Sequence, residues 1–276
     1  MYRLIASDLD ETLLDSSHRI PDRVRAAIRA ARELGARFVP ATGRPFNSVD
    51  DTLADLGLLG APGEYVLSFN GGVIIENSNA SSPLTSCELS PATAGALYEE
   101  GVRRGLCMHL YTLEHVYLYN YLPIERSYIE GRMNIVETHE RTLDFLRRTG
   151  EKTVKLLFMS TSMDELRATE RELADLGLTD GLDVVYSSNR YLEFNAPGVN
   201  KGSGLLELAR RLGISPEETM AIGDSSNDIP MIRAAGLGVA VANATDEAKA
   251  AADYVCEADN NAGGVAEAIE RFVLNA

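Results

Sequence analysis

The sequence of 276 residues contains little cysteine, no long apolar run and fewer basic than acidic side chains. Its three cysteines, Cys87, Cys107 and Cys256, are widely spaced and odd in number, and they do not form the close pairs that bind metal ions. Thiols of this kind are typical of a protein that stays in a reducing compartment. We therefore expect ordinary buried cysteines and a cytoplasmic location.

No apolar segment has the length needed to cross a membrane. The first residues also lack the basic and then apolar layout of a secretion signal. We therefore expect no membrane partner.

The formal net charge at pH 7 is −15. Basic side chains do not cluster along the sequence, so nothing is arranged to neutralise the phosphates of a nucleic acid or of an anionic membrane. This predicts that no nucleic acid is bound, although solubility is the simplest explanation of the acidity. A small phosphorylated ligand would need a local cation to offset the overall negative field.

Apolar side chains make up 45% of the sequence, and the length allows one large or two medium domains. Short apolar strands alternate with helices near both ends of the chain. On the N-terminal side we expect strands at 2–7, 37–44 and 64–72, with helices at 21–35 and 46–60. On the C-terminal side the alternation runs from a helix at 200–212 to a terminal helix ending near 274. This pattern predicts an α/β fold with a doubly wound parallel sheet, covered by helices on both faces.

The pattern changes after a polar loop at 77–86. Alternating strands at 107–112 with 115–120, and at 182–188 with 191–195, predict two antiparallel hairpins. The stretch from 120 to 150 is expected to be helical in pieces. We therefore expect a core domain made of 1–83 and 196–276, interrupted by an α+β domain at 84–195.

Asp8 and Asp10 stand just beyond the first apolar strand. Burying like charges together is costly unless a cation or a proton holds them. In an open parallel sheet, ligands bind beyond the carboxyl ends of the strands, and two carboxylates at that place suit Mg²⁺. Taken by itself, the pair could equally be an acidic turn or a helix cap.

Thr42 and Lys201 add a hydroxyl and a cation. Thr42 follows the second strand in the segment PATGR, where it and free backbone N–H groups could hold a phosphoryl group, although a plain helix N-cap would also explain it. Lys201 begins a helix, where a cation opposes the helix dipole unless an anion lies nearby. An exposed lysine on a loop is the alternative.

A further acidic segment follows the strand that ends at Gly223. Asp224 would lie level with Asp8 if the two strands are neighbours, and Asn227 and Asp228 come close behind. A cap at the start of a helix would account for this segment alone. Four such ends in one sheet, each with an acid, a hydroxyl or a lysine, are much harder to explain as caps.

In this order, the four segments resemble the motifs of the haloacid dehalogenase (HAD)-like hydrolase superfamily. DLDETLL resembles the first motif, ATGR the second, Lys201 the third and GDSSNDIPM the fourth. The insertion between the second and third motifs is similar to the cap of the Cof-type (IIB) subgroup. The segments FNGG and VANA, the latter with Asn243, also resemble that subgroup. The resemblance implies a HAD core with an inserted cap domain and phosphatase chemistry.

The resemblance also implies roles for single residues. Asp8 would be the nucleophile that forms an aspartyl-phosphate, and Asp10 the general acid–base. Mg²⁺ would be held by Asp8, Asp224 and the backbone carbonyl of Asp10, with Asp228 in support. Mg²⁺ and Lys201 would neutralise charge, and Thr42 would complete the catalytic set by orienting the phosphoryl oxygens. The residues expected to bind the substrate are Thr42, Gly43, Arg44, Lys201 and Asn227.

The implied activity is hydrolysis of small phosphomonoesters. Sugar phosphates are the leading class, while pyridoxal phosphate, flavin mononucleotide and nucleotides stay open. A closing cap would exclude bulk water and add specificity contacts. His109 and His115, in a tyrosine-rich hairpin, could contact the substrate, although packing against helices is the commoner role of such an alternation. The oligomeric state stays open.

Other functions fit part of the pattern. A mutase of the same superfamily would transfer the phosphoryl group to a sugar rather than to water. A phospho-acceptor signalling module also has acids, a hydroxyl and a lysine at the ends of a doubly wound sheet, but such modules are shorter and lack a large insertion. GVNKGSG does not fit the P-loop of a kinase or ATPase, and the first strand lacks the G-x-G-x-x-G of dinucleotide enzymes.

Overall fold

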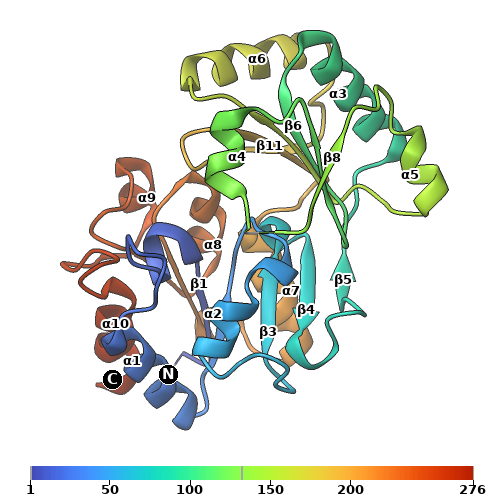
Figure 1. Cartoon of the computed structure of the whole chain (residues 1–276). Coiled ribbons are helices and arrows are strands. Elements are labelled where there is room, and N and C mark those ends of the chain that lie inside the picture. The colour runs from blue at the N-terminus through green and yellow to red at the C-terminus, as the bar shows by residue number, and fades with distance from the viewer. Residues whose placement is uncertain (1, 132, 276) are drawn as a thin grey trace. The chain divides into compact units, whose positions relative to one another are not determined.

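The computed structural model describes residues 2–131 and 133–275, and the chain divides into two compact units (Figure 1). The first unit combines Met1–Thr85 with Asn200–Ala276, and the second is Ser86–Val199. The junctions therefore fall at 85/86 and 199/200, where the sequence predicts 83/84 and 195/196.

A parallel sheet of five strands forms the centre of the first unit, in the order β14-β13-β12-β1-β2. β1 has a neighbour on each side, and Ile5 is opposite Phe38 of β2 and Met220 of β12. The strands are β1 (Leu4–Ser7), β2 (Arg37–Pro40), β12 (Thr219–Gly223), β13 (Leu237–Ala240) and β14 (Tyr254–Val255). Because the five strands run in one direction, their carboxyl ends share one edge of the sheet.

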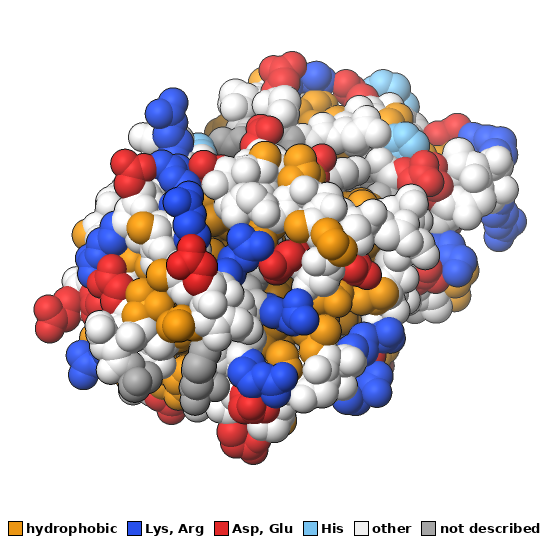
Figure 2. Space-filling model, turned by 90° about the horizontal axis from the view of Figure 1, so that it is seen from below, with side chains coloured by type: hydrophobic (Ala, Val, Ile, Leu, Met, Phe, Trp, Pro, Cys, Tyr) orange, Lys and Arg blue, Asp and Glu red, His pale blue; other side chains and the backbone are white. Residues whose placement is uncertain are grey.

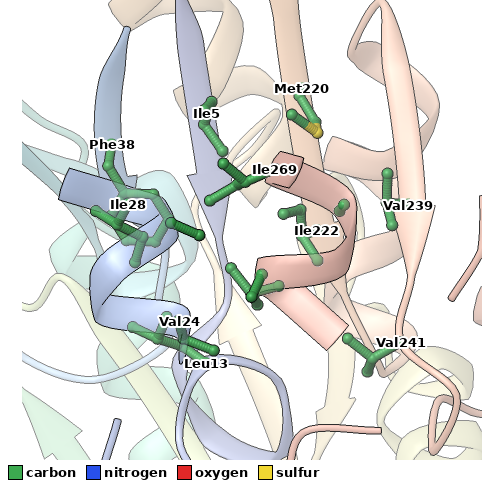
Figure 3. Close-up of a cluster of buried hydrophobic side chains, with 14 of the residues drawn as sticks. Ile5, Leu13, Val24, Ile28, Phe38, Met220, Ile222, Val239, Val241 and Ile269 are labelled. Carbon is green, nitrogen blue, oxygen red and sulfur yellow. The ribbon is translucent and has the colours of Figure 1, made fainter. Parts of the chain in front are cut away.

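The two faces of β1 pack into different apolar clusters, because side chains alternate along a strand. Ile5 lies in one apolar cluster with Val24 of α1 (Asp22–Glu33) and Ile269 of α10 (Gly264–Ile269) (Figure 3). Leu4 packs on the other face with Leu205 of α7 (Lys201–Leu212). The remaining helices of this unit are α2 (Asp50–Asp55), α8 (Ile229–Ala234) and α9 (Asp246–Ala251). Helices cover both faces, so the prediction of a doubly wound α/β fold is confirmed.

Two local predictions for the first unit are wrong. The strand expected at 64–72 lies outside the main sheet, in a sheet of β3 (Tyr65–Ser68), β4 (Val73–Glu76) and β5 (Thr85–Ser86). The chain reverses directly after β3, so β3 pairs antiparallel with β4 and reaches the end of β2 through a single bridge from Leu67 to Ala41. The helix expected at 46–60 is a short turn at Phe46–Ser48 followed by α2, which ends before Gly57, whose φ is +66°.

The second unit contains a sheet of six strands in the order β10-β11-β9-β6-β7-β8. These strands are β6 (Cys107–Tyr111), β7 (Val116–Tyr119), β8 (Ile135–Thr138), β9 (Lys155–Met159), β10 (Asp183–Ser187) and β11 (Tyr191–Asn195). β6 with β7, and β10 with β11, form the two predicted antiparallel hairpins. The expectation of helical pieces alone up to Gly150 is wrong for β8, which pairs parallel with β7. A strand of four residues, two of them half-buried, is too short to show a period.

The two faces of this sheet differ in polarity. Met108 and Phe158 lie in an apolar cluster with Tyr98 and Leu166 from the helices. The alternate positions, which share the opposite face, include three buried polar residues, His109, Lys155 and Glu193. The helices of this unit are α3 (Pro91–Arg104), α4 (Pro123–Ile129), α5 (Asp144–Thr149) and α6 (Met163–Asp175).

Charges of both signs are intermixed on the molecular surface. Arginines of the first unit pair with acids at Arg3–Glu218, Arg23–Glu270 and Arg25–Asp55. On the face shown in Figure 2, basic side chains also lie beside acidic ones. Among the helices of residues 2–131 and 133–275, none combines the length and the apolar character that crossing a bilayer requires.

Candidate active site

Asp8 lies directly after β1, at the carboxyl edge of the main sheet. Its backbone N–H donates to the carbonyl of Ile222 in β12 at 2.9 Å, so the pairing of β1 and β12 continues to this residue. The chain then forms a single wide turn at Leu9–Leu13, in which Asp10 and Glu11 leave helical geometry. The turn separates the buried carboxylate of Asp8 from that of Asp10, whose side chain is 41% exposed.

Lys201, the first residue of α7, bridges two of the predicted acids. Its Nζ lies 2.5 Å from Oδ1 of Asp8 and 2.5 Å from Oδ1 of Asp228, and its side chain is completely buried. Burial alone would lower the pKa of Lys201, but the charges of Asp228 and Asp8 outweigh burial and hold the pKa above its ordinary value. The two carboxylates also remove the conflict between a cation and the helix N-terminus.

Asp224 and Asp228 are held at the end of β12. Oδ2 of Asp228 accepts hydrogen bonds from the backbone N–H groups of Asp224 and Ser225, at 3.0 and 3.1 Å, and Oδ1 of Asp224 accepts one from the hydroxyl of Thr12 at 2.8 Å. A Cβ on Gly223 would lie 2.4 Å from Cβ of Asp228. A glycine at the strand end therefore allows Asp228 to lie so close to the sheet.

Asp8, Asp224 and Asp228 form a cluster of carboxylates that could hold a metal ion. One oxygen from each lies within 4.8 Å of the others. Burial raises the pKa of Asp8 well above its ordinary range, although Lys201 opposes this, and burial followed by the charge of Asp228 raises the pKa of Asp224 to about 7. Three acids against one lysine leave an excess of negative charge. A divalent cation with a preference for oxygen ligands fits this site.

Thr42, Gly43 and Arg44 follow β2 at the same edge of the sheet, since Ser7 of β1 is opposite both Pro40 of β2 and Ile222 of β12. The backbone N–H of Thr42 donates to the carbonyl of Leu67 at 2.8 Å, and its hydroxyl accepts from the backbone N–H of Arg44 at 3.1 Å. The hydroxyl is thereby fixed at the tip of β2.

Arg44 contacts Asp10 rather than the acidic cluster. Its Nε donates to Oδ2 of Asp10 at 2.8 Å, and a second guanidinium nitrogen donates to Oδ1. The side chain of Asp10 is therefore absent from the three-acid cluster, and its predicted contribution to metal binding depends on the backbone carbonyl.

Asn227 is buried beside Asn70, which follows β3. The amide of Asn227 donates to Oδ1 of Asn70 at 3.5 Å and accepts from the hydroxyl of Ser225 at 2.7 Å. Asn70 adopts a φ of +56°. Asn70 and Thr12 are not among the predicted site residues, although Asn70 lies in FNGG, a segment that resembles the Cof-type subgroup.

The two histidines considered as substrate contacts lie in the second unit. Nδ1 of His109 is 3.2 Å from the hydroxyl of Tyr111, and Nδ1 of His115 is 3.1 Å from Oε2 of Glu151. Tyr117, in the same hairpin, packs against Phe145 of α5, with ring centroids 4.9 Å apart. Part of the hairpin therefore packs against a helix, as Tyr117 does. Contact of the two histidines with a substrate stays a prediction.

Comparison with known proteins adds independent information about the whole chain. A family model described as haloacid dehalogenase-like hydrolase matches residues 5–269. YxeH of Bacillus subtilis, whose name gives phosphatase as a provisional activity, is 32% identical over 99% of both chains. YcsE of the same organism, named as a 5-amino-6-(5-phospho-D-ribitylamino)uracil phosphatase, is 30% identical and covers 99% of this chain and 96% of its own. The crystal structure of a haloacid dehalogenase-like hydrolase from Bacteroides thetaiotaomicron has a TM-score of 0.82 at 32% identity, over 98% of this chain and 99% of that one.

Proposed function

The chain belongs to the haloacid dehalogenase-like hydrolase family, and we propose that it hydrolyses small phosphomonoesters through an aspartyl-phosphate on Asp8. The observation that carries this proposal is the placement of Asp8. Its carboxylate lies at a strand end, within 2.5 Å of a buried lysine and beside two more acids. A carboxylate in such a place is suited to nucleophilic attack on a phosphoryl group, whose charge the lysine offsets.

The reaction proceeds in two transfers. An oxygen of Asp8 forms a bond to phosphorus while the bond between phosphorus and the ester oxygen breaks, and Asp10 gives its proton to the leaving oxygen. A water molecule then attacks the phosphorus, Asp10 takes a proton from it, and the bond between phosphorus and Asp8 breaks to release phosphate. Asp8 and Asp10 return to their starting states.

Other residues of the site bind and orient the phosphoryl group. Lys201 is proposed to offset negative charge on the phosphoryl group, because its Nζ lies beside the carboxylate of Asp8 that attacks phosphorus. The hydroxyl of Thr42, the backbone N–H of Gly43 and the side-chain amide of Asn227 are proposed to contact the phosphoryl oxygens. Arg44 binds the substrate once it exchanges its contact with Asp10 for one with the phosphate or the alcohol part.

We assign Mg²⁺ to the three-acid cluster, with Asp8, Asp224, Asp228 and the backbone carbonyl of Asp10 as its ligands. When bound, this ion supplies charge neutralisation to the phosphoryl group. Thr12 supports the site by donating to Asp224, and Lys201 fixes Asp8 and Asp228 through its two ion pairs.

The two units take different parts in this proposal. All the residues with proposed catalytic roles belong to Met1–Thr85 or Asn200–Ala276, so the first unit performs the chemistry. The second unit is proposed to act as the cap that admits the substrate and excludes water. Sugar phosphates are the proposed substrates, a choice supported by the phosphoribityl group in the name of YcsE.

The test is a screen of phosphorylated metabolites with the purified protein, with and without EDTA and added Mg²⁺. We expect release of inorganic phosphate that EDTA abolishes and Mg²⁺ restores, with sugar and polyol phosphates above pyridoxal phosphate, flavin mononucleotide and nucleotides. A phosphorylated protein that does not turn over, or transfer of phosphate to a second sugar without release, would contradict hydrolysis.

A further inference from the structure

The turn that carries Asp10 is held by two asparagines that are far away in sequence. Nδ2 of Asn243 donates to the backbone carbonyl of Glu11 at 2.7 Å, and Nδ2 of Asn260 donates to that of Leu14 at 2.9 Å. The backbone N–H of Asn260 also donates to Oδ1 of Asn243 at 2.9 Å. The two asparagines are thus joined to each other. Asn243 fixes a carbonyl of the turn, and Asn260 fixes that of Leu14, the residue that follows it.

The backbone of this turn needs such support. Glu11 has a φ of +59°, in the left-handed region that residues other than glycine, asparagine and aspartate rarely adopt. A conformation of this kind persists only where its surroundings hold it. Inside the turn, the N–H of Leu14 donates to the carbonyl of Leu9 at 2.9 Å, and the two asparagine amides act from outside.

Asp10 is directly joined to the strained residue. A change in the backbone angles of Glu11 shifts the backbone of Asp10, and with it the carboxylate that is to exchange a proton with the substrate. Asp8 is less sensitive, because its N–H is bonded to β12 and its side chain to Lys201. A displacement of about 1 Å is enough to cost on the order of 100-fold in rate.

We propose that Asn243 and Asn260 are positioning residues for Asp10, and that they set the efficiency of proton transfer to the leaving group. This inference rests on the proposed function. Loss of either amide releases the carbonyl of Glu11 or of Leu14 and lets Asp10 move, while Asp8, Lys201 and the carboxylates of the acidic cluster stay in place. Because the backbone carbonyl of Asp10 is also a proposed Mg²⁺ ligand, the effect is measured at saturating Mg²⁺. The step that suffers is protonation of the leaving oxygen, and the binding of substrate is unaffected.

The experiment compares two substrates that differ in their need for a proton. p-Nitrophenyl phosphate has a good leaving group, whereas a phosphoalkyl ester such as glycerol phosphate has a poor one. We expect Asn243→Ala and Asn260→Ala to lower kcat for the alkyl ester about 10-fold or more, and for p-nitrophenyl phosphate by less than about threefold, with KM unchanged. Asn134→Ala is the matched control, since its amide donates to a backbone carbonyl, that of Glu114, in the second unit.

The outcomes separate this inference from the proposed function. Equal losses on both substrates, or no loss at all in Asn243→Ala, would overturn the positioning role while leaving the phosphatase activity established. A wild-type protein that hydrolyses neither substrate would overturn both. If the buried Asn260 variant does not fold, the exposed Asn243 variant decides the question.

Discussion

Arg44 and Asp10 hold each other through two parallel hydrogen bonds, with Nε of Arg44 donating to Oδ2 of Asp10 at 2.8 Å and a second guanidinium nitrogen donating to Oδ1. These are the residues to which we assign substrate binding and proton transfer. Both oxygens of Asp10 are therefore occupied by a group that the substrate is expected to attract. We therefore expect the binding of a phosphate ester to draw Arg44 away and to free Asp10 for proton transfer.

Arg44→Lys tests this relationship. Lysine keeps the charge but cannot form the two parallel hydrogen bonds of a guanidinium. We expect kcat/KM for sugar phosphates to fall roughly 10- to 100-fold, as for loss of one hydrogen bond to a charged group. Arg126→Lys is the control, because Arg126 pairs with Glu137 at the surface of the second unit. Unchanged kcat/KM in the Arg44 variant would show that two-point contact is unimportant.

Asp8→Asn tests the nucleophile. Asparagine has the same shape as aspartate and can still accept from Lys201, so the fold should be kept, but a neutral amide cannot attack phosphorus to form the aspartyl-phosphate. Turnover should fall by on the order of 10⁴-fold or more. Steady-state phosphate release and a thermal unfolding curve measure the two effects. Asp164→Asn, at an exposed acid of α6, should leave both unchanged, and appreciable activity in the Asp8 variant would remove the assignment.

Asp10→Asn tests the general acid–base. The variant cannot give a proton, so the loss should be about 10²- to 10⁴-fold for alkyl phosphates and clearly smaller for p-nitrophenyl phosphate, whose leaving group needs no proton. The measurement is kcat for a series of aryl and alkyl esters. Equal loss along the whole series would count against proton transfer by Asp10.

The pH dependence of stability is expected to report on His109 in the second unit. Burial lowers the pKa of His109 from its ordinary value of 6.5, and this outweighs the opposing effect of Glu125, whose Oε1 lies 3.2 Å from Nε2. Below pH 6.5 the unfolded chain binds a proton that the folded protein does not bind, so the free energy of unfolding falls as the pH falls. The contribution of His109 is complete above pH 6.5. The groups that face this imidazole or act on its charge are Tyr111, Glu125, Lys155, Tyr191 and Glu193.

Urea unfolding between pH 5 and 7.5 measures this effect. We expect His109→Gln to flatten the slope below pH 6.5 by up to about 1.4 kcal/mol per pH unit relative to the wild type. His139→Gln, at an exposed histidine, should keep the wild-type slope. Identical slopes for all three proteins would show that His109 takes up its proton equally in the folded and unfolded states.

Prediction from sequence was most successful where a signal is local and repeated. The apolar strands at both ends of the chain, each followed by a chemically distinctive residue, predict a parallel sheet and one edge that collects Asp8, Thr42 and Asp224. It failed for β8 and for the partner of β3. The four residues of β8 show no alternation of burial, and strand pairing depends on contacts between distant segments.

The sequence by itself determined which residue types stand at the carboxyl ends of the strands, because the order of strands and the period of apolar residues are written locally. Only the tertiary structure decided which of those residues contact one another. Lys201 forms ion pairs with both Asp8 and Asp228, and Arg44 donates to Asp10, which lies outside the acidic cluster. Asn260 donates to the carbonyl of Leu14, just after the turn that follows β1. These contacts join residues far apart in the chain, and their geometry follows from how the strands and helices pack, which no local pattern encodes.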